Sequence, residues 1–302
     1  MSIPTRVLGR TGRAVSLLGL GGAAALGSPG GVENDARAVE IAQRAFDLGV
    51  TYVDTAPLYG RGDSERRIGA ALRDRPDADR ILIATKVGYV PDDYDYSFDA
   101  TIASVEASRQ RLGLDAIPLV QIHEIRSEIR DVAMGPHGAL TALTRLRDEG
   151  KIRWIGVTGS ALPELTRAIE TGAFDVALVW RHFNLLDRSG ASVLSTAEAL
   201  GLGMIIGTVY ASGILARGSR DPASRHFYDD VPAEIHQRVE AIERACATWN
   251  VSLAAAALQF ATRVPSVSSV IVGADEPDQV DANVRALNET IPDRFWEEIA
   301  DA

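Results

Sequence analysis

The chain has 302 residues, of which 46% are apolar and 24% charged. Both values are typical of a folded protein with a sizeable core, and they exclude an intrinsically disordered chain. The formal net charge of −10 disfavours nucleic acid or an anionic membrane surface as a partner, because such binding rests on lysine and arginine.

Short β-branched runs alternate with segments of helical periodicity, which predicts βαβ units and a parallel sheet. Strands are predicted at residues 16–20, 52–55, 81–87, 119–123, 153–158, 176–180, 204–208 and 269–272. Helices are predicted at residues 36–48, 64–74, 101–112, 138–149, 162–170, 191–200, 233–249 and 278–287, with an extra buried helix at 252–260 and a closing helix at 293–300. Eight strands that alternate with helices indicate an α/β fold of the (β/α)8 TIM barrel type.

The chain shows no linker, charge-run boundary or short internal repeat, so we interpret residues 1–302 as a single barrel domain. Four long stretches are predicted to be irregular, at residues 23–34, 88–99, 125–136 and 214–231. Loops of this length in a compact domain are usually functional.

A glycine motif offers a competing fold. Gly19-Leu20-Gly21-Gly22-Ala23-Ala24 matches the dinucleotide pattern of a doubly wound sheet. In that fold a helix follows the glycines at once, whereas here a dozen glycine-rich residues intervene. We therefore favour the barrel and interpret Gly21 and Gly22 as points where the backbone approaches a ligand closely.

Ionisable side chains stand at the ends of three consecutive predicted strands. Asp54 is followed by Tyr59, Lys86 ends the next strand, and His123 ends the one after. Each residue alone is more often a solvated or packing group, but the carboxyl ends of barrel strands converge on one face. An ammonium beside buried strand residues also needs a partner, and Asp54 is the nearest candidate.

This group predicts acid–base chemistry at an oxygen atom. A tyrosine is a poor catalyst near neutral pH unless a cation stabilises its phenolate, so we expect Lys86 to lower the pKa of Tyr59. Asp54 would keep Lys86 charged and aimed, and His123 would orient a carbonyl or hydroxyl oxygen. The arrangement suits proton transfer coupled to hydride transfer by a nicotinamide cofactor.

Other site chemistries lack their sequence patterns. The histidines show no metal-ligand spacing, so we expect no metal centre, and neither a Walker-type loop nor a G-x-S-x-G elbow occurs. The lone Cys246 excludes an intramolecular disulfide framework. Residues 1–10 lack the apolar core of a secretory signal, and no stretch has the length of a spanning helix, so we expect a cytoplasmic protein without a membrane partner.

Several motifs together resemble the aldo-keto reductases. They are Asp54-Thr55-Ala56-Pro57-Leu58-Tyr59-Gly60, Ser64-Glu65-Arg66-Arg67-Ile68-Gly69, Thr85-Lys86, Ile122-His123 and Gly150-Lys151-Ile152-Arg153-Trp154-Ile155-Gly156-Val157. The resemblance implies a barrel with a nicotinamide dinucleotide across its mouth and a catalytic tetrad of Asp54, Tyr59, Lys86 and His123. The segments 8–12, 94–99 and 295–296 look most like the branch of aldose 1-dehydrogenases, which includes L-fucose, L-galactose and D-threo-aldose dehydrogenases and is also similar to pyridoxal 4-dehydrogenase.

The resemblance also implies a set of cofactor-binding residues: Gly21, Gly22, Asp54, Thr158, Gly207, Val209, Ser212, Leu215, Val272, Gly273, Ala274, Asp275, Gln279 and Asn283. Tyr59, His123 and Trp180 are predicted to bind substrate. The chain departs from the family pattern at Thr158-Gly159, at Trp180 and at Gly207, so the nicotinamide is expected to be held differently, by Trp180 or His182.

The carboxylate of Asp275 would repel the 2′-phosphate of NADP, so we expect NAD to be preferred. The predicted reaction is oxidation of an aldose at C1 to the lactone, and Arg181, His182 and Asn184 would suit a hydroxyl-rich ligand. Two alternatives stay open: pyridoxal or another aldehyde or ketone as substrate, and a regulatory subunit that binds the nucleotide with slow turnover. The expected partner is a small-molecule sugar or aldehyde, and the chain is expected to be a monomer or homodimer.

Overall fold

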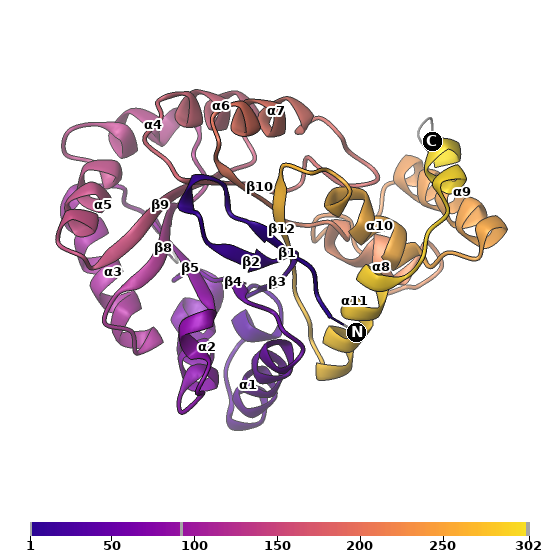
Figure 1. The fold of residues 1–302 in the computed structure, drawn as a ribbon, viewed down its shortest axis with the longest axis horizontal. Helices are drawn as coiled ribbons and strands as arrows, with labels where there is room; N and C mark the ends of the chain where they lie inside the picture. Colours follow the sequence, from indigo (N-terminus) through magenta and orange to yellow (C-terminus); the bar gives the residue numbers. More distant parts are fainter. Residues whose placement is uncertain (1, 91–92, 300–302) are drawn as a thin grey trace.

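The computed structural model describes residues 2–90 and 93–299, and within them eight parallel strands close into a barrel (Figure 1). The predicted (β/α)8 TIM barrel is therefore confirmed. In order around the barrel the strands are β3 (Leu18–Gly21), β4 (Tyr52–Asp54), β5 (Leu82–Val87), β8 (Ile117–Ile122), β9 (Ile152–Gly159), β10 (Val176–Val179), β11 (Gly203–Ile206) and β12 (Val267–Val272), and β12 pairs with β3 to close the ring.

Helices surround the barrel (Figure 1). They are α1 (Val32–Asp47), α2 (Asp63–Leu72), α3 (Phe98–Leu112), α4 (Ser127–Met134), α5 (Ala139–Asp148), α6 (Leu162–Glu170), α7 (Ala191–Ala199), α8 (Ile214–Arg217), α9 (Ala233–Trp249), α10 (Leu253–Thr262), α11 (Pro277–Asn288) and α12 (Asp293–Glu298). Within the part of the chain that the structure describes, no helix is long and apolar enough to cross a membrane.

The barrel is packed on both sides of its wall. All six residues of β5 are buried, because alternate side chains of a barrel strand face the interior and the surrounding helices. Large apolar side chains such as Tyr52, Leu119 and Ile205 belong to the interior cluster. The filled interior leaves ligand binding to the loops at the strand ends.

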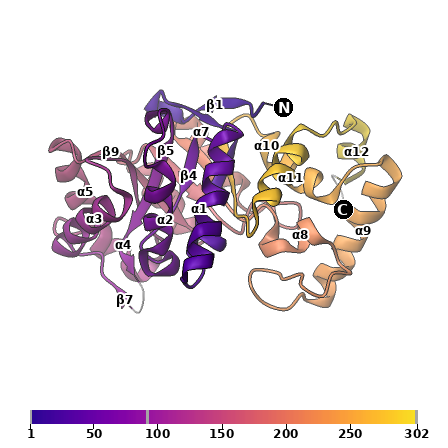
Figure 2. The ribbon, with the colours of Figure 1, turned by 90° about the horizontal axis from the view of Figure 1, so that it is seen from below.

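An antiparallel hairpin of β1 (Thr5–Val7) and β2 (Ala14–Ser16) precedes the barrel. Its Leu8 and Val15 are fully buried in the interior cluster, so the hairpin closes one end of the barrel. A second hairpin, β6 (Tyr89–Val90) with β7 (Asp93–Tyr94), lies at the opposite end, as the positions of β1 and β7 in Figure 2 show.

Four of the sequence-based elements need correction. The predicted strand 16–20 merges two elements, because Ser16 pairs with Thr5 in the hairpin and the barrel strand begins at Leu18. The predicted loop 125–136 contains α4, and the loop 214–231 begins with the short α8. The predicted last helix, 293–300, ends at Glu298 in α12, and residue 300 lies outside the described residues.

Candidate active site

The four ionisable residues singled out in the sequence meet at the carboxyl ends of β4, β5 and β8. Lys86 Nζ donates a hydrogen bond to the carboxylate of Asp54, and another to the backbone oxygen of Thr55 at 2.9 Å. It also lies 3.1 Å from Tyr59 Oη. The side chains of Asp54 and Lys86 are each 2% exposed, so the ammonium is buried with its charge matched, as the sequence predicted.

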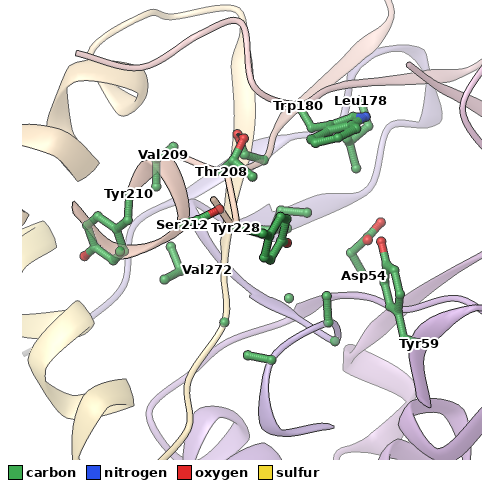
Figure 3. A pocket seen from close by; sticks show the side chains of 18 of the residues that line it. Asp54, Tyr59, Leu178, Trp180, Thr208, Val209, Tyr210, Ser212, Tyr228 and Val272 are labelled. Atoms are coloured by element: carbon green, nitrogen blue, oxygen red, sulfur yellow. Dashed lines mark hydrogen bonds between the residues drawn. The ribbon is translucent and has the colours of Figure 1, made fainter. Parts of the chain in front are cut away.

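The loop between β4 and α2 sets the position of Tyr59. Tyr59 begins a short turn at Tyr59–Gly62, in which Gly60 has a φ of 60° and Gly62 a φ of 90°. A Cβ atom at Gly60 would lie 2.8 Å from the backbone oxygen of Gly27. Glycine is therefore needed here for both conformation and space. The turn directs the phenol toward Asp54, as Figure 3 shows, and toward Lys86.

The ionisation of Tyr59 differs from the sequence-based expectation. Burial raises the pKa of Tyr59 above its ordinary value, and Asp54 adds to this rise, while Lys86 lowers the pKa without cancelling it. Lys86 thus acts on Tyr59 in the expected direction, but the net pKa is raised and not lowered, because desolvation of the phenolate outweighs the neighbouring charge. Burial alone would lower the pKa of Lys86, but Asp54 and Tyr59 reverse this and the net pKa is raised.

His123 presents a neutral imidazole to the same space. Burial lowers its pKa well below the ordinary value, and the charge of Lys86 lowers it further. Its ring stands perpendicular to that of Tyr59, at 89°, with 6.0 Å between the ring centres. The Nδ1 atom is buried and finds no hydrogen-bond partner in residues 2–90 and 93–299, while the residue itself lines the cavity described below.

A supporting layer beneath these residues was missed in the sequence. Gln121 Nε2 donates to Asp54 Oδ2 at 2.9 Å, which occupies the second carboxylate oxygen. Glu65 is fully buried and accepts from Thr85 Oγ1 at 2.5 Å and from Arg111 Nε at 2.6 Å. Gln121 and His123 are two residues apart on one strand path, so strand alternation alone could have placed Gln121 on the side of the site.

A cavity of about 1030 Å³ is lined by all four residues, and Figure 3 shows Asp54 and Tyr59 at its edge. The sequence-predicted residues that line it are Gly21, Gly22, Asp54, Tyr59, Lys86, His123, Thr158, Trp180, Gly207, Val209, Ser212, Val272, Gly273, Asp275, Gln279 and Asn283. Leu215 and Ala274 were also predicted, but they do not line the cavity, because both side chains are buried in the apolar core.

The polar residues proposed after β10 also lie elsewhere. Asn184 is fully buried and donates to the backbone oxygen of Arg181 at 2.8 Å. His182 Nδ1 lies 2.9 Å from Asp187 Oδ2, and Arg181 stacks over Phe227 at 4.4 Å. These side chains shape their own loop, so of the expected groups after β10 only Trp180 lines the cavity.

Further cavity residues come from the irregular segments, where periodicity gives no signal. Tyr89, Tyr94, Glu124, Arg126, Tyr210 and Tyr228 all line it. Tyr228 is 72% exposed and stands between the two sides of the cavity in Figure 3. Tyr210 Oη donates to Asn283 Oδ1 at 2.9 Å, which connects the loop after β11 to α11.

The remaining wall suits an elongated polar ligand. Ser212 has a φ of 61°, and its buried hydroxyl meets no hydrogen-bond partner within the described part of the chain. Because an unpaired buried hydroxyl is costly, a polar ligand group such as a phosphate fits this position. At Gly22 it is packing within the protein that requires glycine, since a Cβ there would lie 2.5 Å from Ser64 Oγ. The residues present therefore fit a nicotinamide dinucleotide along β11, β12 and β3.

Comparison with known proteins places this site in a family. The model of the aldo/keto reductase family matches residues 17–302. The chain belongs to this family. A pyridoxal 4-dehydrogenase from Microbacterium luteolum is 34% identical, over 96% of this chain and 95% of that protein. A D-threo-aldose 1-dehydrogenase from a Pseudomonas species is 33% identical over the same shares.

Two further relatives agree with this assignment. L-Galactose dehydrogenase from Arabidopsis thaliana is 32% identical over 95% of this chain and 89% of its own length. Among solved structures, an aldo-keto reductase from Bacillus halodurans in its holo form superposes with a TM-score of 0.81 at 25% identity, over 99% of this chain and 97% of that one. This aldo-keto reductase is thus an NAD(P)-dependent oxidoreductase that acts on a small molecule.

Proposed function

We propose that this aldo-keto reductase oxidises an aldose at its anomeric carbon to the lactone, with NAD as the hydride acceptor. One observation carries the proposal: Tyr59 Oη lies 3.1 Å from Lys86 Nζ at a cavity that His123 also lines. These are the groups needed to move a proton at a substrate oxygen. Two of the similar proteins are named as aldose or galactose dehydrogenases, which supports a sugar as substrate.

Each of the four residues then has a distinct task. Tyr59 removes the proton from the C1 hydroxyl during oxidation and returns it during reduction. Lys86 stabilises the phenolate of Tyr59, and Asp54 keeps Lys86 charged and aimed. His123, neutral in the site, hydrogen-bonds the reacting oxygen and fixes its orientation. The nicotinamide, when bound, supplies the hydride chemistry.

The proposed cofactor contacts follow the cavity wall. The loop after β11 would hold the phosphates through Val209 and Ser212, and the chain of the dinucleotide would pass Gly21 and Gly273, which line the cavity. Asp275, Gln279 and Asn283 would surround the adenosine. Two contacts within the protein already order this end: the backbone nitrogen of Asp275 donates to Gln279 Oε1 at 2.8 Å, and Tyr210 Oη donates to Asn283 Oδ1 at 2.9 Å.

The preference for NAD rests on charge at the adenosine end. Asp275 lines the cavity, and nearby Arg37 is engaged by Glu276 at 2.7 Å and by Asn34 at 2.8 Å. A 2′-phosphate would meet a carboxylate there. We expect kcat/KM with NAD to exceed that with NADP by about tenfold or more, and Asp275→Asn to narrow the ratio. A tenfold preference for NADP in the wild type would reject the proposal.

A second candidate substrate is pyridoxal, because the pyridoxal 4-dehydrogenase matches this chain as well as the aldose enzymes do. Tyr89 and Trp180 on the cavity wall offer flat faces for an aromatic ring. A panel of aldoses, pyridoxal and simple aldehydes, assayed in both directions with NAD or NADH, separates the two. A kcat/KM for aldoses that exceeds the value for pyridoxal by about tenfold or more supports an aldose as the substrate.

The role of Tyr59 is tested by Tyr59→Phe, which removes one oxygen atom and keeps the ring. We expect kcat to fall by about 10²-fold to 10⁴-fold, because general acid–base catalysis contributes on that order. The affinity for NADH, measured by calorimetric titration, should stay near that of the wild type. Activity within a few-fold of wild type would contradict the assignment.

A further inference from the structure

Glu124 joins the carboxyl ends of three adjacent barrel strands. It follows β8, its Oε1 accepts from the backbone nitrogen of Ser160 after β9 at 3.1 Å and from Ser160 Oγ at 2.5 Å, and its Oε2 accepts from Trp180 Nε1 after β10 at 2.5 Å. Charge-assisted hydrogen bonds of this length are among the stronger ones in proteins. Both carboxylate oxygens of Glu124 are therefore used to hold neighbouring strand ends.

The backbone of Glu124 is held in an unfavourable conformation. Its φ is 55°, a left-handed value that a side chain with a Cβ seldom adopts. The backbone nitrogen of Glu124 donates to Thr158 Oγ1 at 2.9 Å, and that of Ile125 donates to the backbone oxygen of Thr158 at 2.7 Å. Strain that surrounding contacts enforce in this way concentrates at functional sites.

Trp180, the residue that Glu124 holds, stands on the cofactor side of the cavity. Its strand β10 lies between β9, which carries Thr158, and β11, which is followed by Gly207. A Cβ atom at Gly207 would lie 3.3 Å from Trp180 Cβ, so the absence of a side chain at 207 leaves that wall to the indole. Figure 3 shows the indole at the cavity, beside Leu178 and Thr208.

We propose that Glu124 is a positioning residue, which fixes the indole of Trp180 so that its face packs against the nicotinamide. The inference rests on the proposed function, because it places the cofactor between Thr158 and Gly207. The hydrogen bond to Glu124 removes the freedom of the indole to rotate away, so the ring is ordered before the cofactor arrives. Preorganisation of this kind increases affinity by reducing the entropy lost on binding.

Calorimetric titration with NADH tests the inference without knowledge of the substrate. Trp180→Ala should raise the dissociation constant of NADH by about tenfold, the upper part of the range for one aromatic contact. Glu124→Ala should raise it by about fivefold, whereas Glu124→Gln, which keeps a carbonyl acceptor for the indole N–H, should raise it by about twofold. Thermal melting of each variant shows that the barrel is folded.

A double-mutant cycle separates positioning from general structural support. If Glu124 acts through the indole, Glu124→Ala adds no further loss of NADH affinity in the Trp180→Ala background. A matched control exists at the far end of the chain, where Trp249 Nε1 donates to Glu298 Oε2 at 2.6 Å in an exposed pair. Glu298→Ala removes the same kind of contact and should leave NADH binding unchanged.

Each result is decisive. Additive losses in the cycle, or an NADH affinity in Trp180→Ala equal to that of the wild type, overturn the inference and leave the proposed function standing. If the wild-type protein does not bind NADH at all, the proposed function is rejected as well. A loss of NADH affinity of about fivefold in Glu124→Ala, a smaller loss in Glu124→Gln and no additional loss in the double variant support it.

Discussion

Tyr59 and Lys86 show how burial and a neighbouring charge oppose each other within one contact. The ammonium lies 3.1 Å from the phenol oxygen, yet burial keeps the pKa of Tyr59 raised. The phenol is therefore protonated at neutral pH. In this state Tyr59 is ready to donate a proton to a carbonyl, while oxidation of an alcohol needs the less populated phenolate.

This ionisation predicts a pH dependence for oxidation. The active base is the phenolate, and its fraction grows about tenfold per pH unit below a pKa that is raised above about 10. The kcat/KM for oxidation should thus rise from about pH 7 to 9 with a logarithmic slope near one, and Lys86→Met should lower it across the range. Steady-state rates in both directions check this, and a plateau that begins below about pH 8 would contradict it.

His123 predicts a pH dependence of stability. Its pKa in the folded protein lies well below the unfolded value of about 6.5. Between these two values the unfolded chain binds a proton that the folded chain cannot, so stability is lost as the pH falls below about 6.5, by at most about 1.4 kcal/mol per pH unit.

The variant His123→Gln should lose less stability per pH unit than the wild type. Urea unfolding between about pH 5 and 7.5 measures this dependence. The half-buried His236, whose side chain is 42% accessible, supplies the control His236→Gln, which should keep the wild-type dependence of stability on pH. Equal slopes for wild type and His123→Gln would show that the buried imidazole does not drive the effect.

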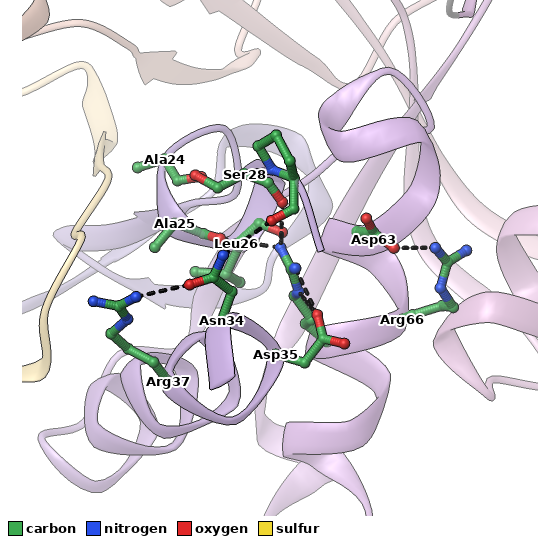
Figure 4. A network of polar contacts seen from close by, with 11 residues as sticks. Ala24, Ala25, Leu26, Ser28, Asn34, Asp35, Arg37, Asp63 and Arg66 are labelled. Carbon is green, nitrogen blue, oxygen red and sulfur yellow. Dashed lines mark hydrogen bonds and ion pairs between the residues drawn. The ribbon is translucent and has the colours of Figure 1, made fainter. Parts of the chain in front are cut away.

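At the scale of elements, Arg67 on α2 organises the loop that leads from β3 to α1. Its Nη1 donates to the backbone oxygens of Leu26 at 2.7 Å and Ser28 at 2.9 Å, and its Nε donates to Asp35 at 2.8 Å. The side chain of Arg67 is only 3% exposed. Figure 4 shows Leu26, Ser28 and Asp35 close to one another, with Ala24 nearby, and Ala24 lines the cavity.

Arg67→Ala should therefore destabilise the protein by about 2–3 kcal/mol, because buried backbone oxygens lose a charged donor. It should also weaken NADH binding, since the loop borders the cavity. Arg66→Ala is the matched control on the same helix: Arg66 is 54% exposed and pairs with Asp63, and an exposed pair contributes about 1 kcal/mol or less. Similar losses in the two variants, measured by urea unfolding, would argue against this role of Arg67.

Periodicity identified the elements whose apolar pattern is long. Each predicted barrel strand from 52–55 onward overlaps a strand of the barrel, because runs such as β5 are buried along their whole length. The pattern missed α4, whose eight residues offer a single buried position, Ala133. It also placed Asp54, Lys86 and His123 together, since strand ends converge. Glu124 escaped notice because its partners come from other strands, and no local pattern encodes such contacts. Gln121 could have been found from the strand alternation that it shares with His123.

For the whole molecule, the two ends of the barrel have different tasks. The site occupies the carboxyl ends of the strands, while the β1–β2 hairpin closes the other end (Figure 2). Such a separation lets one end be optimised for stability without altering the chemistry at the other. Arg6 in the hairpin connects the beginning of the chain to its last third, because its guanidinium donates to the backbone oxygens of Thr262, Val264 and Val267, each at 2.7 Å.

Arg6→Ala tests this division. The loss of three charge-assisted hydrogen bonds at a half-buried position should lower the free energy of unfolding by about 2 kcal/mol, measured by urea unfolding. The kcat/KM should stay within about twofold of wild type, because the reacting groups lie at the opposite end of strands whose positions the rest of the barrel still fixes. The exposed Arg10, also in the hairpin region, gives the control Arg10→Ala, with a change of about 0.5 kcal/mol or less. A variant of Arg6 that keeps its stability but loses activity would show that the hairpin influences the site, and would argue against separate tasks for the two ends.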